Sequence, residues 1–292
     1  MTATITSPTE PQIAQVKMLV EHVVRKSGVD FDGLQRLIEK GGEFQDGLVS
    51  LITRLSRQEN PYADEKEEQD CYYPEGWTVA PLNVQADRLA SVFPGLDIVF
   101  QTSGSEPLGD GFALIPKLSA IARIAGIEDP YGAGYGRLVE HVLGHIGQSR
   151  RFTNYRDRQL GPDDLRINAE TRALLEMLES ETPSDCLVLS FSFGNDYAGF
   201  SVRNARWETL HSNQLPLGAA QVGSLLLAMP DRLTHYDDLW LDCPGDEYDW
   251  SRDGKWTNYP YFDFCDGGVK FNTDWSNDAH SNSGSVAAFL GK

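Results

Sequence analysis

The sequence lacks a long hydrophobic run. Its longest apolar stretch is interrupted by Gln221, Gly223 and Ser224, whereas a membrane-spanning helix needs about 20 consecutive apolar residues. Residues 1–11 are rich in Thr, Ser and Pro, and they have neither the basic start nor the apolar segment of a secretory signal. We therefore expect a protein that does not bind membranes and remains in the cytoplasm.

Cysteines are few, and none of them stands in a Cys-x-x-Cys pair. This spacing does not favour a zinc knuckle or a dithiol redox site. A secreted disulfide framework would also place more cysteines within fewer residues. We expect buried free thiols at the four positions, which are Cys71, Cys186, Cys243 and Cys265.

The familiar nucleotide-binding and hydrolase motifs are missing as well. The chain contains no GxGxxG that opens a helix, no GxxxxGK[ST] and no GxSxG. Residues 132–136 are rich in glycine, but Asp129-Pro130 stands where a strand should precede a phosphate-binding loop. The sequence therefore favours a non-enzymatic protein without a cofactor, and it leaves catalysis open.

Basic side chains are outnumbered. The chain has 25 Lys and Arg residues against 43 Asp and Glu residues, which gives a net charge of −18. A surface of this charge repels phosphate, so we expect no direct binding of duplex nucleic acid. The excess of acidic side chains is concentrated in two regions. Residues 61–110 carry 2 basic and 10 acidic side chains, and residues 181–292 carry 7 basic and 16 acidic side chains.

What the sequence does contain is enough apolar material for a core, since 40% of its 292 residues are hydrophobic. Periodicity predicts an α+β fold with an N-terminal helical hairpin or bundle, a mixed middle, and a C-terminal, mostly antiparallel sheet with one buried helix. We expect a disordered leader (1–10), a helical region (11–60), an acidic linker (61–80), a mixed helical region (81–180) and a sheet region (181–292). The last two regions alternatively form one domain.

Three helices are expected between Glu10 and Leu55, because apolar residues recur there at helical spacing. Ser27-Gly28 and Gly41-Gly42 separate these helices, and Asp30 is placed to cap the second one. Each helix has a single apolar stripe, so the region needs the rest of the protein, or a partner, to bury it.

Farther along the chain we expect a helix over Asp163–Leu178 and a hairpin of two strands, Cys186–Phe193 and Tyr197–Trp207. Residues 217–229 are rich in Ala and Leu and predict a helix in the core. A second hairpin is predicted to turn at Asp266-Gly267.

Aromatic and acidic residues are crowded together after residue 237. Aromatic anchors with an acidic rim are typical of a surface that binds a basic protein. We expect the partner to contact Asp246, Glu247, Asp249, Trp250, Asp253 and Trp256. Inhibitors of nucleases and immunity proteins use charge in this way, although the likeness is one of charge and not of sequence.

Two alternatives concern bound ions. Asp249, Ser251 and Asp253 have the spacing of a calcium loop, which would bind calcium or magnesium weakly, although Asp253-Gly254 also predicts a simple hairpin turn. A metal-dependent hydrolase that uses the C-terminal aspartates would follow from this site. His141 and His145 share one face of a helix, but the residue after His141 is not the glutamate of a zinc protease.

A further alternative is a nucleotide or RNA site in the segment between Arg150 and Arg172. Guanidinium groups bind phosphate and stack on bases, and an aromatic side chain can stack beside them. The candidate residues are Arg150, Arg151, Tyr155, Arg156 and Arg158. In so acidic a chain these arginines also have many internal carboxylates with which to pair.

Overall fold

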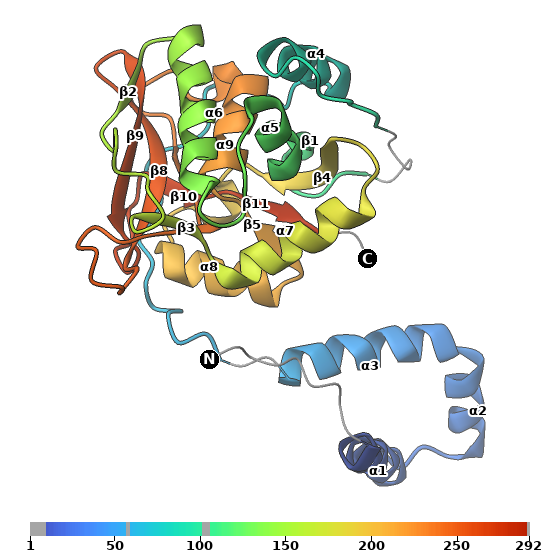
Figure 1. Cartoon of the computed structure of the whole chain (residues 1–292). Helices are drawn as coiled ribbons and strands as arrows, with labels where there is room; N and C mark the ends of the chain where they lie inside the picture. The colour runs from blue at the N-terminus through green and yellow to red at the C-terminus, as the bar shows by residue number, and fades with distance from the viewer. Residues whose placement is uncertain (1–9, 57–58, 101–105, 291–292) are drawn as a thin grey trace. The chain divides into compact units, whose positions relative to one another are not determined.

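The computed structural model describes residues 10–56, 59–100 and 106–290, and the chain divides into two compact units. The first unit is Met1–Glu59 and the second is Asn60–Lys292. The structure confirms an α+β protein with N-terminal helices, a mixed middle and C-terminal sheets (Figure 1). The predicted leader lies outside the described residues, apart from its last residue. Within the described residues, no helix combines the length and the apolar character that crossing a membrane requires.

The first unit contains the three predicted helices, α1 (Glu10–Lys26), α2 (Phe31–Glu39) and α3 (Gly41–Ser56). The turn after α1 uses Gly28 at a φ of 70°, a conformation that glycine adopts without steric cost. The Asp30 carboxylate then accepts a hydrogen bond of 2.8 Å from the amide of Gly33 and caps α2, as the sequence predicts.

The second unit contains two sheets within the described residues. The four-stranded sheet has the order β1-β4-β11-β5 and is antiparallel throughout. Its strands are β1 (Gly111–Pro116), β4 (Cys186–Ser192), β11 (Ala287–Phe289) and β5 (Gln214–Pro216).

The seven-stranded sheet follows the path β10-β6-β8-β7-β3, and β9 joins β8 to β2. Its strands are β2 (Phe152–Asn154), β3 (Leu165–Ile167), β6 (Trp240–Asp242), β7 (Asp246–Tyr248), β8 (Asn258–Cys265), β9 (Gly268–Trp275) and β10 (Ser283–Ser285). The β8–β9 hairpin turns at Asp266 and Gly267, both with positive φ, which confirms the predicted hairpin.

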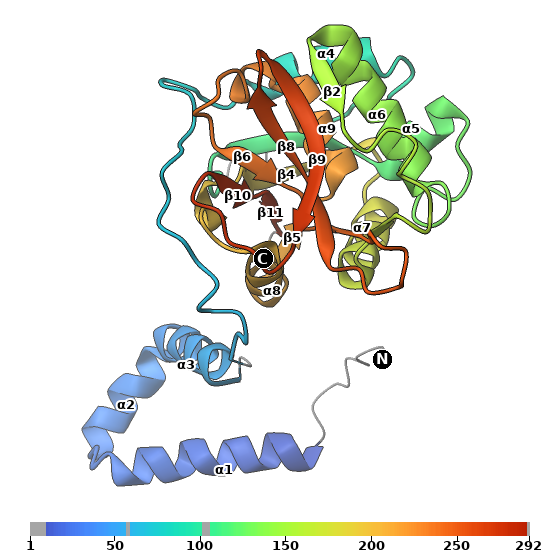
Figure 2. The same ribbon diagram turned by 90° about the vertical axis from the view of Figure 1, so that its left-hand side faces the viewer.

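Helices α6 and α9 run side by side in the middle of the second unit (Figures 1 and 2). Helix α6 contacts β2 and β3 of the larger sheet, whereas α9 contacts β1 of the smaller one. Every residue of α9 is buried, as expected for a helix with almost no charge. The helices of this unit are α4 (Leu82–Val92), α5 (Leu118–Ala125), α6 (Tyr135–Ser149), α7 (Ala169–Glu181), α8 (Val202–His211) and α9 (Ala219–Ala228), with short 3-10 turns at Asn195–Tyr197 and Pro230–Arg232.

One predicted strand is wrong, and one predicted helix begins later than expected. Tyr197–Trp207 is not the second strand of a hairpin, because Ser201 accepts a hydrogen bond from the amide of Asn204 and begins helix α8. Strand β4 pairs instead with β1 and β11. The helix expected from Asp163 begins only at Ala169, after β3, where the Asn168 side chain caps it.

The structure confirms that the cysteines are free thiols, and it confirms the predicted burial for two of them. All four cysteines are free, and Cys186 and Cys243 are buried in the core. Cys71 and Cys265 are only partly buried. No disulfide therefore constrains the fold, and its stability comes from packing.

Helix α6 offers a direct test of that packing. A methyl group on Gly136 would collide with the carbonyl oxygen of Leu160, whereas one on Gly144 of the same helix meets nothing within 4 Å. We expect Gly136→Ala to lower the free energy of unfolding by about 1–3 kcal/mol through overpacking. Gly144→Ala should raise it by about 0.5–1 kcal/mol, because alanine is the better helix former. Urea unfolding of both variants measures these changes. If both variants shift the free energy of unfolding in the same direction, the close contact between Gly136 and Leu160 is refuted.

Candidate protein-binding surface

The segment expected as a linker, residues 61–80, is bound along its length to the rest of the second unit. The amide of Glu67 donates to the carbonyl of Gly199 at 2.8 Å, and the amide of Asp70 donates to that of Ser281 at 2.9 Å. The amide of Leu239 in turn donates to the carbonyl of Tyr72 at 2.8 Å. The acidic stretch at residues 64–70 is therefore fixed beside parts of the second acidic stretch, which lies within residues 181–292.

Glu65 anchors this segment. Its carboxylate accepts hydrogen bonds from the hydroxyl of Ser201, at 2.6 Å, and from the guanidinium of Arg203. The hydrogen bonds from Arg203 are the main reason that the pKa of Glu65 is lowered. Glu65 thus belongs to the fold and leaves its acidic neighbours to face the solvent.

The two acidic stretches meet where Tyr72 forms a β-bridge with Asp238. Nearby acidic side chains are exposed, and so are Tyr72 (60%) and Tyr236 (64%). The pKa of the Cys71 thiol is raised to about 11, mainly by burial and further by the charges of Asp70, Asp237 and Asp238. We call this surface the acidic face and define it as Glu67, Glu68, Asp70, Tyr72, Tyr236 and Asp237.

Two of the predicted contact residues are instead internal. Asp246 is fully buried and accepts hydrogen bonds from the hydroxyl of Tyr135 at 2.8 Å and from the amide of Ala219 at 2.7 Å. Burial raises the pKa of Asp246 to about 7. Asp249 is 3% exposed and accepts a hydrogen bond from the amide of Gly254 at 2.6 Å. Their carboxylates stabilise the fold, so neither is placed to contact a partner.

The aromatic side chains of the same stretch stack on the arginine segment. The guanidinium of Arg156 lies 4.1 Å from the ring centroid of Trp250, and that of Arg166 lies 4.0 Å from the ring centroid of Trp256. Arg166 also pairs with Glu247 at 2.7 Å. The two sites that the sequence predicts separately are therefore adjacent, and Arg166 of β3 and Glu247 of β7 join them across the strand pair.

The other candidate nucleotide-binding residues differ in exposure. Arg150 donates hydrogen bonds to the carbonyl oxygens of Pro230 and Leu233, and burial lowers its pKa to about 10. Arg151, Tyr155 and Arg158 are exposed. Only part of the predicted set can therefore reach a phosphate group.

The predicted metal ligands are not gathered into a cluster. Across the described parts of the chain, no group of three or more His, Cys, Asp or Glu residues is arranged to hold a metal ion. In the calcium-like loop, Asp253 pairs with Lys255 at 2.6 Å, and Ser251 is exposed. The ring nitrogens of His141 and His145 lie 3.4 Å apart, and partial burial lowers the pKa of both.

Two other aspartates of the C-terminal region are buried. Asp242 is 1% exposed and accepts a hydrogen bond of 2.9 Å from the hydroxyl of Ser283, and burial raises its pKa to about 7. Asp263 is 6% exposed, and burial raises its pKa to about 6. Much of the acid counted after residue 237 thus lies inside the protein.

Comparison of the chain with protein-family models, with curated proteins and with solved structures finds no match.

Sequence reasoning missed the acidic face, although one of its two parts is visible in the sequence as an acidic run. The run of acidic residues from Asp64 to Asp70 is typical of a solvated connection, and the exposed Tyr72 follows it closely. Tyr236 and Asp237 are distant in sequence, and no local pattern links them to that run. Only the pairing of Tyr72 with Asp238 brings the two groups together.

The raised pKa of Asp242 predicts a pH dependence of stability. Because its pKa in the folded protein is about 7, above the ordinary 3.8, its contribution to stability is complete below about pH 4 and is lost as the pH rises through about 7. We expect the free energy of unfolding to fall less between about pH 5 and about pH 8 in Asp242→Asn than in the wild type. Urea unfolding at both pH values measures the difference.

Asp266→Asn is the matched control, because Asp266 is exposed and pairs with Lys270, which lowers its pKa. Its contribution lies below this pH range, so the wild-type pH dependence should persist in that variant. If the free energy of unfolding of Asp242→Asn falls as much as that of the wild type over this pH range, then Asp242 ionises normally in the folded state.

Proposed function

We propose that this protein binds a basic surface of another protein through its acidic face. The observation that carries the proposal is the meeting of two acidic stretches around exposed tyrosines, where Tyr72 pairs with Asp238. Carboxylates at the rim attract and orient a basic partner, and tyrosine rings supply contact area with little loss of conformational entropy. No catalytic step is needed for this role.

The charge balance of the second unit supports the proposal. Residues 60–292 carry 18 basic and 35 acidic side chains. Several of the cations are already engaged: Arg203 pairs with Glu65, Arg206 donates to backbone carbonyl oxygens, and Arg232 is fully buried with its guanidinium 4.1 Å from the ring centroid of Tyr73. The exposed carboxylates therefore remain largely uncompensated and can steer a cationic partner.

The position of the acidic face within the fold also suits binding. Its backbone is held by hydrogen bonds to residues 199, 239 and 281, so little ordering is required when a partner binds. Its chemistry differs from that of the Arg156–Trp250 cluster, whose cation already stacks on its own ring.

A triple variant tests the proposal. Glu68→Gln, Asp70→Asn and Asp237→Asn together remove three charges from the acidic face without changing its shape. The wild-type chain, immobilised in a lysate of the cells that make it, should capture a basic protein that is released as salt is raised, because ions screen charge-driven association. We expect the triple variant to bind that protein about tenfold more weakly in a titration at low salt.

The control removes three exposed charges elsewhere, with Asp87→Asn, Glu128→Gln and Glu140→Gln. It has the same net charge as the triple variant and should bind nearly as well as the wild type. Equal weakening in both variants would mean that net charge alone drives capture, and capture that is insensitive to salt would refute a charge-driven site.

A further inference from the structure

The first unit exposes an unusual amount of apolar surface. Among the side chains described between residues 10 and 52, none is buried. Phe31 is 81% exposed, Ile38 70%, Met18 68%, Leu19 65% and Val23 63%. Contiguous exposed apolar surface of this kind is typical of an interface.

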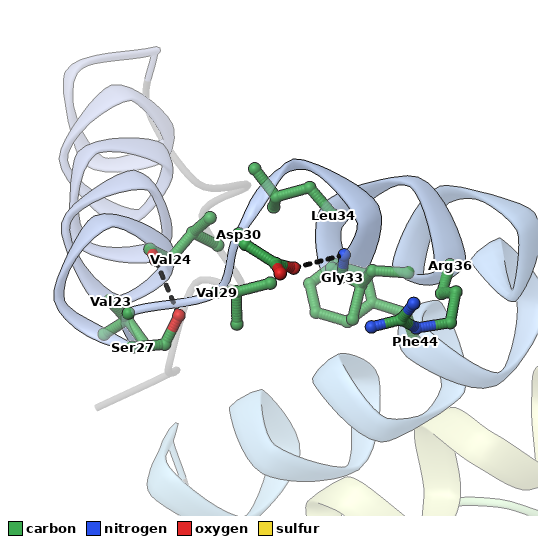
Figure 3. Close-up of a pocket in the computed structure, with 11 residues that line it drawn as sticks. Val23, Val24, Ser27, Val29, Asp30, Gly33, Leu34, Arg36 and Phe44 are labelled. Carbon is green, nitrogen blue, oxygen red and sulfur yellow. Dashed lines mark hydrogen bonds between the residues drawn. The ribbon is translucent and has the colours of Figure 1, made fainter.

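The exposed side chains line a groove between α1 and α3. The groove has a volume of about 510 Å³, and Leu19 and Val23 of α1 face Leu48 and Ile52 of α3 across it. A second hollow, of about 620 Å³, continues from it past the corner between α1 and α2. Figure 3 shows Val23, Val24, Leu34 and Phe44 at that corner, beside the hydrogen bond from Gly33 to Asp30.

The sequence explains why the three helices do not close this groove themselves. The connections between helices are short, since four residues separate α1 from α2 and only Lys40 separates α2 from α3. The cap at Asp30 and the left-handed turn at Gly28 fix these bends locally. So small a unit cannot enclose a core of its own, and its apolar stripes need a further surface to cover them.

We propose that this groove binds the same groove of a second copy of the chain, so that the protein forms a homodimer through its first unit. A two-fold axis lets one apolar surface serve both copies, because each provides a groove and the side chains that fill the other. Helices α1 and α3 from two copies then enclose one core in the manner of a four-helix bundle.

Charge selects a second copy over a charged partner. Residues 1–59 carry 7 basic and 8 acidic side chains, so two first units do not repel each other. The groove is lined by aliphatic and aromatic side chains and offers a charged partner no complementary group. The best match for this groove is a surface that is as apolar and as close to neutral as the groove itself. Every copy of the chain has such a surface.

The charges of α1 also fit an antiparallel dimer. The helix begins at Glu10 and ends at Lys26, which follows Arg25, and Arg25 already pairs with Glu21 at 2.6 Å. A two-fold axis across its middle places the acidic end of one α1 beside the basic end of the other. The two helix dipoles are then antiparallel as well, which is the favourable arrangement.

The test measures the mass of the full chain by sedimentation equilibrium from about 1 to about 100 µM. We expect the wild type to sediment as a dimer with twice the mass of one chain. Leu19→Asp with Val23→Asp places charges in both copies of the groove and should raise the dissociation constant by about a hundredfold or more. A wild type that remains monomeric over this range overturns the proposal.

The matched control is Leu108→Asp with Val99→Asp, which changes exposed apolar residues of the second unit. Val99 is 62% exposed against 63% for Val23, and Leu108 is 57% exposed against 65% for Leu19. This control should remain a dimer. A dimer that survives the groove substitutions, or that the control substitutions dissociate, places the interface elsewhere and also overturns the proposal. Unchanged thermal unfolding of the second unit in both variants shows that the substitutions act on association.

Discussion

The buried carboxylate of Asp246 is the interaction on which the second unit depends. A carboxylate that has left water must receive hydrogen bonds, because an unpaired buried charge is very costly. Asp246 receives them from Tyr135 of α6 and from the first amide of α9, where the helix dipole favours negative charge. The guanidinium of Arg206 in α8 donates to its carbonyl oxygen at 2.6 Å. One residue of β7 therefore fixes three helices against the larger sheet.

This constraint explains why the acidic residues of the C-terminal region could not be assigned to the surface from sequence. A count of charges treats each carboxylate as exposed, but Asp242, Asp246, Asp249 and Asp263 are all buried. The donors to Asp242 and Asp246 come from elements far away in the chain, such as Ser283 for Asp242 and Tyr135 for Asp246, and no spacing rule reveals them. For the same reason the acidic face was missed, since it depends on the long-range pairing of Tyr72 with Asp238.

The fold itself was more predictable, because periodicity and turns are local. The three N-terminal helices, the buried helix α9 and the β8–β9 hairpin each have a pattern contained within a few residues. Helix α8 was missed because Tyr197–Trp207 is rich in aromatic residues, and the cap at Ser201 outweighs that tendency. The separation of α7 from β3 was hidden likewise, since Leu165–Ile167 continues the apolar pattern of the helix that follows.

The two associations that we propose involve different units of the chain, and ionic strength acts on them in opposite directions. The acidic face belongs to a unit with 18 basic and 35 acidic side chains, so salt must weaken its attraction for a cation. The groove of the first unit is lined by apolar side chains in a nearly neutral segment, and salts excluded from protein surfaces strengthen such burial. Raising the concentration of sulfate therefore favours self-association while it releases a basic partner. The opposite responses to sulfate therefore distinguish the two associations in one titration.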